Sequence, residues 1–217
     1  MLPMVLDLSR LAAILVGDGE VALRRLALLD EAGAKRLTIF AEAPSEALAL
    51  AAGKRLVRRL PQAEEIAAAR LVFLSERQAS YVTDMVSRAR RTGALVHVED
   101  DPSLSDMYST AVLRQGALTI AISTGGASPG LAVQLKRFLG TFFGPEWRER
   151  LEQIGTLRRH WRAEGIDYKT LAKRSDEWVS RQGWLPPEEV LSRSPGKTEF
   201  QLHDTAPRPA DGIDPRS

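Results

Sequence analysis

The sequence has no cysteine at all and only three histidines, His97, His160 and His203. The absence of cysteine excludes disulfides, thiolate metal sites and cysteine nucleophiles, and it suits a reducing cytoplasm. The three histidines stand far apart, without the spacing of metal ligands. We therefore expect no resident metal site.

Long apolar runs and a strong excess of one charge are also missing. No stretch approaches the roughly 20 apolar residues that span a bilayer, and the first residues carry an acid without a basic segment, so we expect no membrane contact and no signal peptide. Lys and Arg total 30 against 28 acids, which argues against a nucleic-acid partner. The 217 residues, 44% of them hydrophobic, fit one good core with a smaller appendage.

The stretch 12–34 has the pattern of a strand, a tight turn and a helix. An apolar run meets a Gly-x-Gly turn at Gly17 and Gly19, and apolar residues then recur at helical spacing. Gly17 allows the sharp turn, Gly19 lets a pyrophosphate approach the backbone, and Ala22 permits close helix packing. The helix N-terminus adds unpaired amides and a positive dipole end. This pattern predicts a dinucleotide site, to which Glu20 and Val21 also contribute.

A second strand-like run, 36–41, ends on Glu42, which is followed by Ala43. Glu42 stands about 20 residues beyond the glycine turn, where an acid binds the ribose of a dinucleotide. A carboxylate there favours NAD because it repels the 2′-phosphate of NADP. The alternative is a solvated loop acid, and the sequence leaves both open.

Three more strand-like runs, 55–60, 71–74 and 94–98, alternate with helical segments. This alternation predicts an α/β fold with a Rossmann-type, doubly wound parallel sheet. Because ligands bind at the carboxyl ends of such strands, the edge of interest carries Gly17, Glu42, Ser75 and Asp100. Ser45 is a suitable cap for a helix over 46–52.

After residue 103 the pattern changes. Two strands over 110–113 and 117–123 form a hairpin, a helix covers 131–143, and two helices fill 146–181. We predict a dinucleotide-binding domain at 1–109, a connecting segment at 110–144, a helical domain at 145–187 and a disordered tail at 188–217.

Three blocks of sequence stand in one order: VGDGEVALRR, VHVEDDP and RQGALTIAISTGGASPGLA. Together they resemble the precorrin-2 dehydrogenase and sirohydrochlorin ferrochelatase family, which includes the N-terminal module of siroheme synthase. The segment 122–129 is the most specific of the three, and the resemblance covers residues 2–145. Asp18 departs from the family pattern, which usually has glycine at this place.

The resemblance implies a cytoplasmic homodimer, dimerised through 110–144, that oxidises precorrin-2 to sirohydrochlorin with NAD⁺. Some members then insert ferrous iron to give siroheme. Asp100 matches the family's key aspartate for both reactions, and Ser75 matches a hydroxyl residue near the nicotinamide. As an alternative to this role, Ser75 caps the helix that follows it.

The chemistry of both reactions also favours a base at Asp100, because oxidation and metal insertion each release protons. The alternative is that Asp100 or Asp101 only caps the turn before Pro102. A non-enzymatic hypothesis also stays open, in which the chain is a dinucleotide-sensing regulatory module and Asp100 is dispensable.

Candidate substrate-binding residues follow from the third block. Thr124 matches a hydroxyl residue of the family's substrate cleft, and Ser123 stands beside it. The amides of Gly125 and Gly126 either bind a substrate carboxylate or only form the turn into the next helix. Arg114 is a candidate partner for the carboxylates of the tetrapyrrole, although most such charges belong to solvated surfaces.

Overall fold

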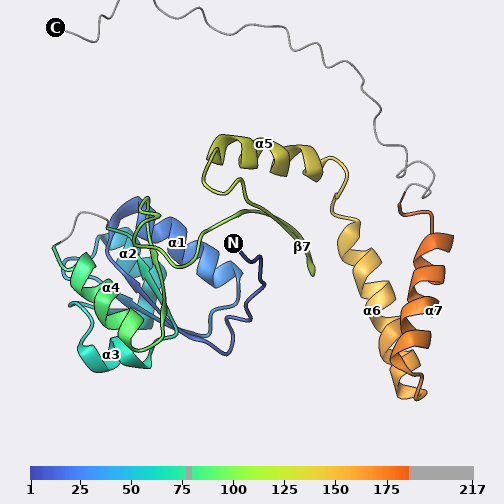
Figure 1. The fold of residues 1–217 in the computed structure, drawn as a ribbon, viewed down its shortest axis with the longest axis horizontal. Coiled ribbons are helices and arrows are strands. Elements are labelled where there is room, and N and C mark those ends of the chain that lie inside the picture. The colour runs from blue at the N-terminus through green and yellow to red at the C-terminus, as the bar shows by residue number, and fades with distance from the viewer. Residues whose placement is uncertain (77–79, 186–217) are drawn as a thin grey trace, which may run out of the picture. The chain divides into compact units, whose positions relative to one another are not determined.

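The computed structural model describes residues 1–76 and 80–185. The chain divides into two compact units, the first formed by Met1–Leu113 and Ile120–Leu139, and the second by Arg114–Thr119 and the chain from Gly140 on. The predicted disordered tail at 188–217 lies outside the described residues. Figure 1 shows the strands and helices of both units.

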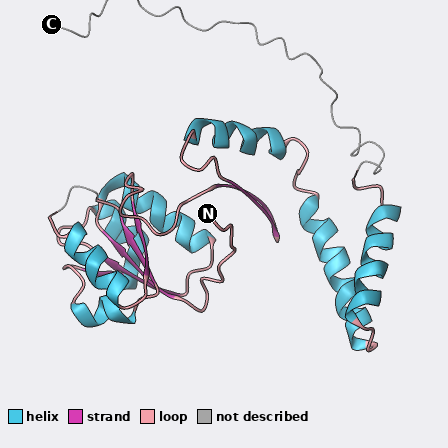
Figure 2. Cartoon of the chain, viewed as in Figure 1, coloured by secondary structure: helices cyan, strands magenta, loops and turns pink. Residues whose placement is uncertain are grey.

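The first unit contains a five-stranded parallel sheet with the strand order β3-β2-β1-β4-β5. The predicted doubly wound sheet is therefore confirmed. Its strands, drawn as magenta arrows in Figure 2, are β1 (Ala12–Val16), β2 (Arg36–Phe40), β3 (Leu56–Val57), β4 (Leu71–Leu74) and β5 (Leu95–Val98). β3 is shorter than the predicted 55–60, because a 3₁₀ turn at Gly53–Arg55 precedes it and the chain bends away at residues 58 and 59.

Successive side chains of the strands point to opposite faces of the sheet and pack into two hydrophobic clusters. On one side, Leu15, Ile39 and Phe73 pack with α1 (Gly19–Glu31) and α2 (Glu46–Ala52). On the other, Val16 and Val72 pack with α3 (Ala63–Ala68) and α4 (Val82–Arg91). Because helices cover both faces of the sheet, the sequences of its strands are nearly continuous apolar runs.

Ser45 caps α2 as predicted, since its hydroxyl accepts the backbone N–H of Leu48 at 3.3 Å. Helix α4 is one of the helical segments that the sequence predicts between its strands.

The hairpin consists of β6 (Ala111–Gln115) and β7 (Leu118–Ile122) and turns at Gly116, whose φ is +60°. Helix α5 (Pro129–Gly140) begins two residues before its predicted start at 131. Proline suits the first turn of a helix because its missing N–H is not needed there.

The second unit contains the helices α6 (Trp147–Ala163) and α7 (Tyr168–Arg181). They are separated near Gly165, and Asp167 caps α7 by accepting the N–H groups of Lys169 and Thr170. Over residues 1–76 and 80–185, no helix combines the length and apolar character that a membrane crossing requires.

Candidate functional site

The carboxyl ends of the strands lie side by side along one edge of the sheet. The backbone N–H of Gly17 donates to Phe40 O, that of Ser75 to Val16 O and that of Glu99 to Leu74 O. The structure therefore brings the ends of β1, β2, β4 and β5 together at the edge where parallel sheets bind their ligands.

The glycine turn after β1 has the conformation that a dinucleotide site needs. Gly17 and Gly19 have φ values of +119° and +79°, which side chains rarely adopt. A Cβ on Gly17 would lie 2.2 Å from Ser75 Oγ, whereas the space around Gly19 is open. Ala22 is fully buried, so α1 packs closely on the sheet. The turn and the first amides of α1 fit the phosphates of a dinucleotide.

Ser75 supports this turn from the neighbouring strand. It is only 8% exposed, and its hydroxyl donates to Val16 O at 3.0 Å. The alternative that Ser75 caps the following helix is wrong, because α4 begins at Val82 and the hydroxyl is used elsewhere. A role beside the nicotinamide stays a prediction.

Asp18 uses its carboxylate to tie the turn to the start of α2. Its two oxygens accept the backbone N–H and the hydroxyl of Ser45, each at 2.8 Å. Burial opposes ionisation, but hydrogen bonds from Gly19 and Ser45 outweigh it and lower the pKa of Asp18. The departure from the family's glycine is thus a fixed, ionised side chain.

Glu76 contacts the same turn, and no motif in the sequence indicated this contact. Its Oε1 accepts the backbone N–H of Asp18 at 2.8 Å, and its Oε2 accepts the hydroxyl of Tyr81 at 3.1 Å. Burial, followed by the charge of Glu76, raises the pKa of Tyr81, and Glu42 adds a smaller effect in the same direction. Three acidic side chains therefore gather around the turn.

The other residues that are predicted to contact the dinucleotide lie near the end of β2 and at the start of α1. Glu42 and Ala43 are exposed and lie just beyond the end of β2, after Ala41, while Glu20 and Val21 are in the first turn of α1. Their contacts with a dinucleotide stay predictions.

The loop after β5 contains two aspartates, Asp100 and Asp101, which differ in contacts and backbone conformation. Asp101 caps the turn, because its Oδ1 accepts the N–H groups of Ser103 and Leu104 and the hydroxyl of Ser103. Asp100 is exposed and has a φ of +54°, the only left-handed residue other than glycine among those described. The contacts of Asp101 support the turn-capping alternative for that residue, and the unusual backbone conformation belongs to Asp100.

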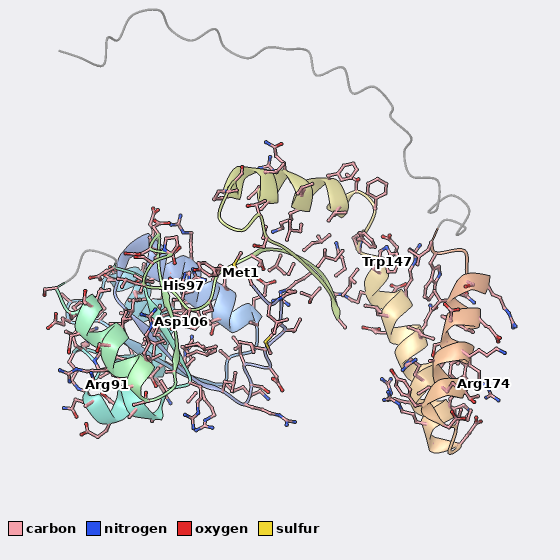
Figure 3. All side chains as sticks on the ribbon, in the orientation of Figure 1. Met1, Arg91, His97, Asp106, Trp147 and Arg174 are labelled. Atoms are coloured by element: carbon pink, nitrogen blue, oxygen red, sulfur yellow. The ribbon has the colours of Figure 1, made fainter. Side chains whose placement is uncertain are left out.

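A buried ionic cluster lies directly behind this loop. Arg25 of α1 donates to Glu99 Oε2 at 2.6 Å, to His97 Nε2 at 2.8 Å and to the hydroxyl of Ser109. Its guanidinium also lies 5.7 Å from the ring centre of Phe73. Figure 3 labels His97 within this unit. The sequence did not predict this cluster, because an arginine on an amphipathic helix usually points to solvent.

Both ring nitrogens of His97 have partners. His97 Nδ1 lies 3.0 Å from the carbonyl oxygen of Met107, which can only accept, so Nδ1 is a donor in this contact. His97 Nε2 lies 2.8 Å from Arg25 Nη2 and 3.4 Å from Glu99 Oε2. The side chains of His97 and Arg25 lower the pKa of Glu99 to about 2, against the effect of burial. The carboxylate of Glu99 is therefore held by two neighbours, His97 and Arg25.

The loop after β7 is a compact turn that leads into α5. Thr124 Oγ1 accepts the N–H of Ser128 at 3.2 Å and donates to its carbonyl at 3.0 Å. Gly125 and Gly126 have φ values of +64° and +87°, and the N–H of Gly125 donates to Ser123 Oγ. These contacts support the turn-forming alternative for the two glycines. Substrate binding by this loop stays a prediction.

Arg114 lies in the hairpin, where its Nη1 donates to Thr119 Oγ1 at 3.2 Å. In the helical unit, Trp178 and Trp184 pack edge to face, with ring centres 5.1 Å apart, and Arg150 lies over Trp147 and Trp184. Over residues 1–76 and 80–185, no group of three or more acidic or histidine side chains could hold a metal ion.

Several known proteins are similar to this chain. Siroheme synthase of Methylococcus capsulatus is 35% identical over 143 residues, which are 64% of this chain and 30% of that protein. Siroheme synthase 2 of Aeromonas salmonicida is 32% identical over 202 residues, which are 85% of this chain and 42% of that protein. The chain therefore spans less than half the length of these relatives. The solved structure of SirC, precorrin-2 dehydrogenase, covers 88% of this chain and 96% of its own, with a TM-score of 0.66 and 20% identity, and it supports the fold.

The glycine turn, the strand order and the acidic loop at the sheet edge define a Rossmann-type dinucleotide-binding protein. A family model described as putative NAD(P)-binding matches residues 4–111, and one described as the central part of sirohaem biosynthesis proteins matches residues 115–140. The chain belongs to the precorrin-2 dehydrogenase and sirohydrochlorin ferrochelatase family, as a relative of the N-terminal module of siroheme synthase.

Proposed function

We propose that this chain oxidises precorrin-2 to sirohydrochlorin with NAD⁺, as a step of siroheme biosynthesis. The observation that carries the proposal is Asp100 itself, which is exposed at the ligand-binding edge of the sheet with a left-handed backbone conformation, φ +54°. Backbone strain of this kind is typical of functional residues.

In this proposal the glycine turn and the first amides of α1 hold the phosphates, and Glu42 binds the adenosine ribose. When bound, NAD⁺ supplies the acceptor for the hydride that leaves the substrate. Asp100 accepts the proton that the oxidation releases, as a carboxylate at the surface of the site is able to do. The ion pair between Arg25 and Glu99 holds the first residue of this loop in place.

The substrate is a polycarboxylate, and we propose that Arg114 and the loop from Ser123 to Gly126 bind it. We further propose a cytoplasmic homodimer that binds neither nucleic acid nor membranes. The dimer is supported by α5, whose apolar side chains at Leu131, Val133, Leu135 and Phe138 are between 38% and 58% exposed. The same base, Asp100, would accept the pyrrole protons if ferrous iron is inserted as a second substrate.

The variant Asp100→Asn tests the enzymatic proposal against the sensing module. It keeps the shape of the side chain and removes the base, so we expect NAD⁺ binding within twofold of the unmodified chain and a loss of turnover of roughly 100-fold or more. Asp84→Asn, an exposed aspartate on α4, is the matched control and keeps full activity. Full turnover by Asp100→Asn would refute the assignment of the base.

A further inference from the structure

We infer that Glu76 sets the affinity of this chain for dinucleotides, because its carboxylate occupies the phosphate-binding turn and must leave before a phosphate can bind there. The inference rests on the proposed use of NAD⁺ and adds a residue that competes with it. Nothing in the glycine pattern itself points to this residue.

The first observation is the position of the Glu76 carboxylate. Its Oε1 accepts the backbone N–H of Asp18, the residue between the two glycines, at 2.8 Å. A Cβ on Gly17 would lie 3.1 Å from both Cγ and Oε1 of Glu76, so the side chain lies across the turn on the face that glycine leaves open. A carboxylate oxygen and a phosphate oxygen are both anionic acceptors for the same N–H. The two cannot use this amide together.

The second observation is the support that Glu76 receives from Tyr81. The Tyr81 hydroxyl donates to Oε2 at 3.1 Å, so each oxygen of the carboxylate has a donor. Burial and the charge of Glu76 raise the pKa of Tyr81, which therefore stays a protonated donor at neutral pH. Because Tyr81 directly precedes α4, the carboxylate is held between the turn after β1 and the start of a helix.

The third observation shows which acidic side chain has to move. Asp18 is held by two hydrogen bonds to Ser45, at the start of α2. Glu76 is an exposed residue on a flexible stem, and it can turn into solvent without a change in the backbone of the turn. Water then solvates the freed carboxylate, and the amide of Asp18 becomes available to the dinucleotide.

The consequence is a dinucleotide affinity that is lower than the turn alone would give. When a binding-competent conformation is only partly populated, the apparent dissociation constant rises by the inverse of that population. A charge-assisted hydrogen bond to a backbone amide is strong enough to reduce affinity roughly tenfold. Repulsion between the two anions adds to this effect.

The test measures NAD⁺ binding to the full chain by isothermal titration calorimetry. Glu76→Gln keeps the size of the side chain and removes its charge, and Glu76→Ala removes the competing group. We expect Glu76→Ala to bind NAD⁺ roughly tenfold more tightly and Glu76→Gln several-fold more tightly, because the amide oxygen of Gln still accepts the N–H of Asp18 but carries no charge. Tyr81→Phe should bind NAD⁺ about two- to threefold more tightly because one support of the carboxylate is lost. Glu64→Gln, an exposed glutamate on α3, controls for the change in net charge and keeps the original affinity.

Inorganic pyrophosphate serves as a second probe, since it contains only the group that competes with Glu76. An unchanged or weaker affinity of both Glu76 variants for NAD⁺ would overturn the inference, even if the unmodified chain oxidises precorrin-2. Tighter binding without any oxidation of precorrin-2 would support the inference and reject the proposed function. If no variant binds NAD⁺, both are wrong.

Discussion

Replacing Arg25 by methionine removes the cation of the buried cluster while keeping much of the side chain's apolar length. The Arg25 side chain is 9% exposed and that of Glu99 is 26% exposed, so the variant leaves a largely enclosed carboxylate without its ion-pair partner. His97 stays beside Glu99 in this variant and keeps part of the stabilisation of the carboxylate.

The magnitude follows from the pKa of Glu99, which is lowered from 4.5 to about 2. At about 1.4 kcal/mol per pKa unit, this shift corresponds to about 3 kcal/mol of stability at neutral pH, which His97 and Arg25 supply together. Removal of one partner of a buried ion pair costs about 3–5 kcal/mol. Because His97 remains beside Glu99 and Glu99 keeps some contact with water, we expect Arg25→Met to lower the free energy of unfolding by about 2 kcal/mol.

Urea unfolding followed by circular dichroism measures this change, with Arg24→Met, an exposed neighbour on α1, as the matched control. The control is expected to stay within about 0.5 kcal/mol of the unmodified chain.

The pKa of Glu99 is lower in the folded chain than in the unfolded chain, so the stabilising effect of its carboxylate is present above pH 4.5 and is lost as the pH falls toward 2. The difference between Arg25→Met and the unmodified chain should therefore shrink by about 1 kcal/mol between pH 7 and pH 3.5. Equal stability of the two arginine variants at both pH values would refute the reasoning.

Three further variants test local features. Gly17→Ala places a Cβ against Ser75 Oγ in a conformation with φ of +119°, so we expect a loss of about 2 kcal/mol in thermal unfolding and at least tenfold weaker NAD⁺ binding by calorimetry. Ser45→Ala removes both the cap of α2 and the partner of Asp18, and chemical denaturation should show a loss of about 1 kcal/mol. Asp167→Ala removes the cap of α7, and we expect a local destabilisation of about 1 kcal/mol. It should appear as faster hydrogen exchange in α7, with an unchanged NAD⁺ affinity. An equal increase of the exchange in α1 would contradict a local effect.

The alternating pattern of the sequence predicted the sheet because its signals are local. Apolar runs of strand length and a Gly-x-Gly turn are visible in the order of the residues, and the structure places β1, β4 and β5 within a residue or two of the predicted ranges. The third strand was predicted too long, since the pairing of an edge strand depends on its neighbour, which a single run of residues does not show.

The contacts of the site depend on residues far apart in the chain, and these were largely missed. Glu76 reaches Asp18 across 58 residues, and Arg25 reaches Glu99 across 74. Neither pair has a sequence spacing that would indicate it. The role of Asp101 was only one of two alternatives, because adjacent aspartates before a proline look equivalent until their backbone angles are known.

The central claim, oxidation of precorrin-2 with NAD⁺, is tested most directly by an anaerobic absorbance assay of the full chain. NADH and the spectrum of sirohydrochlorin should appear together and in equal amounts, and later addition of ferrous iron tests the second reaction separately. A chain that binds NAD⁺ in calorimetry but forms no NADH from precorrin-2 would contradict the claim and favour the dinucleotide-sensing module.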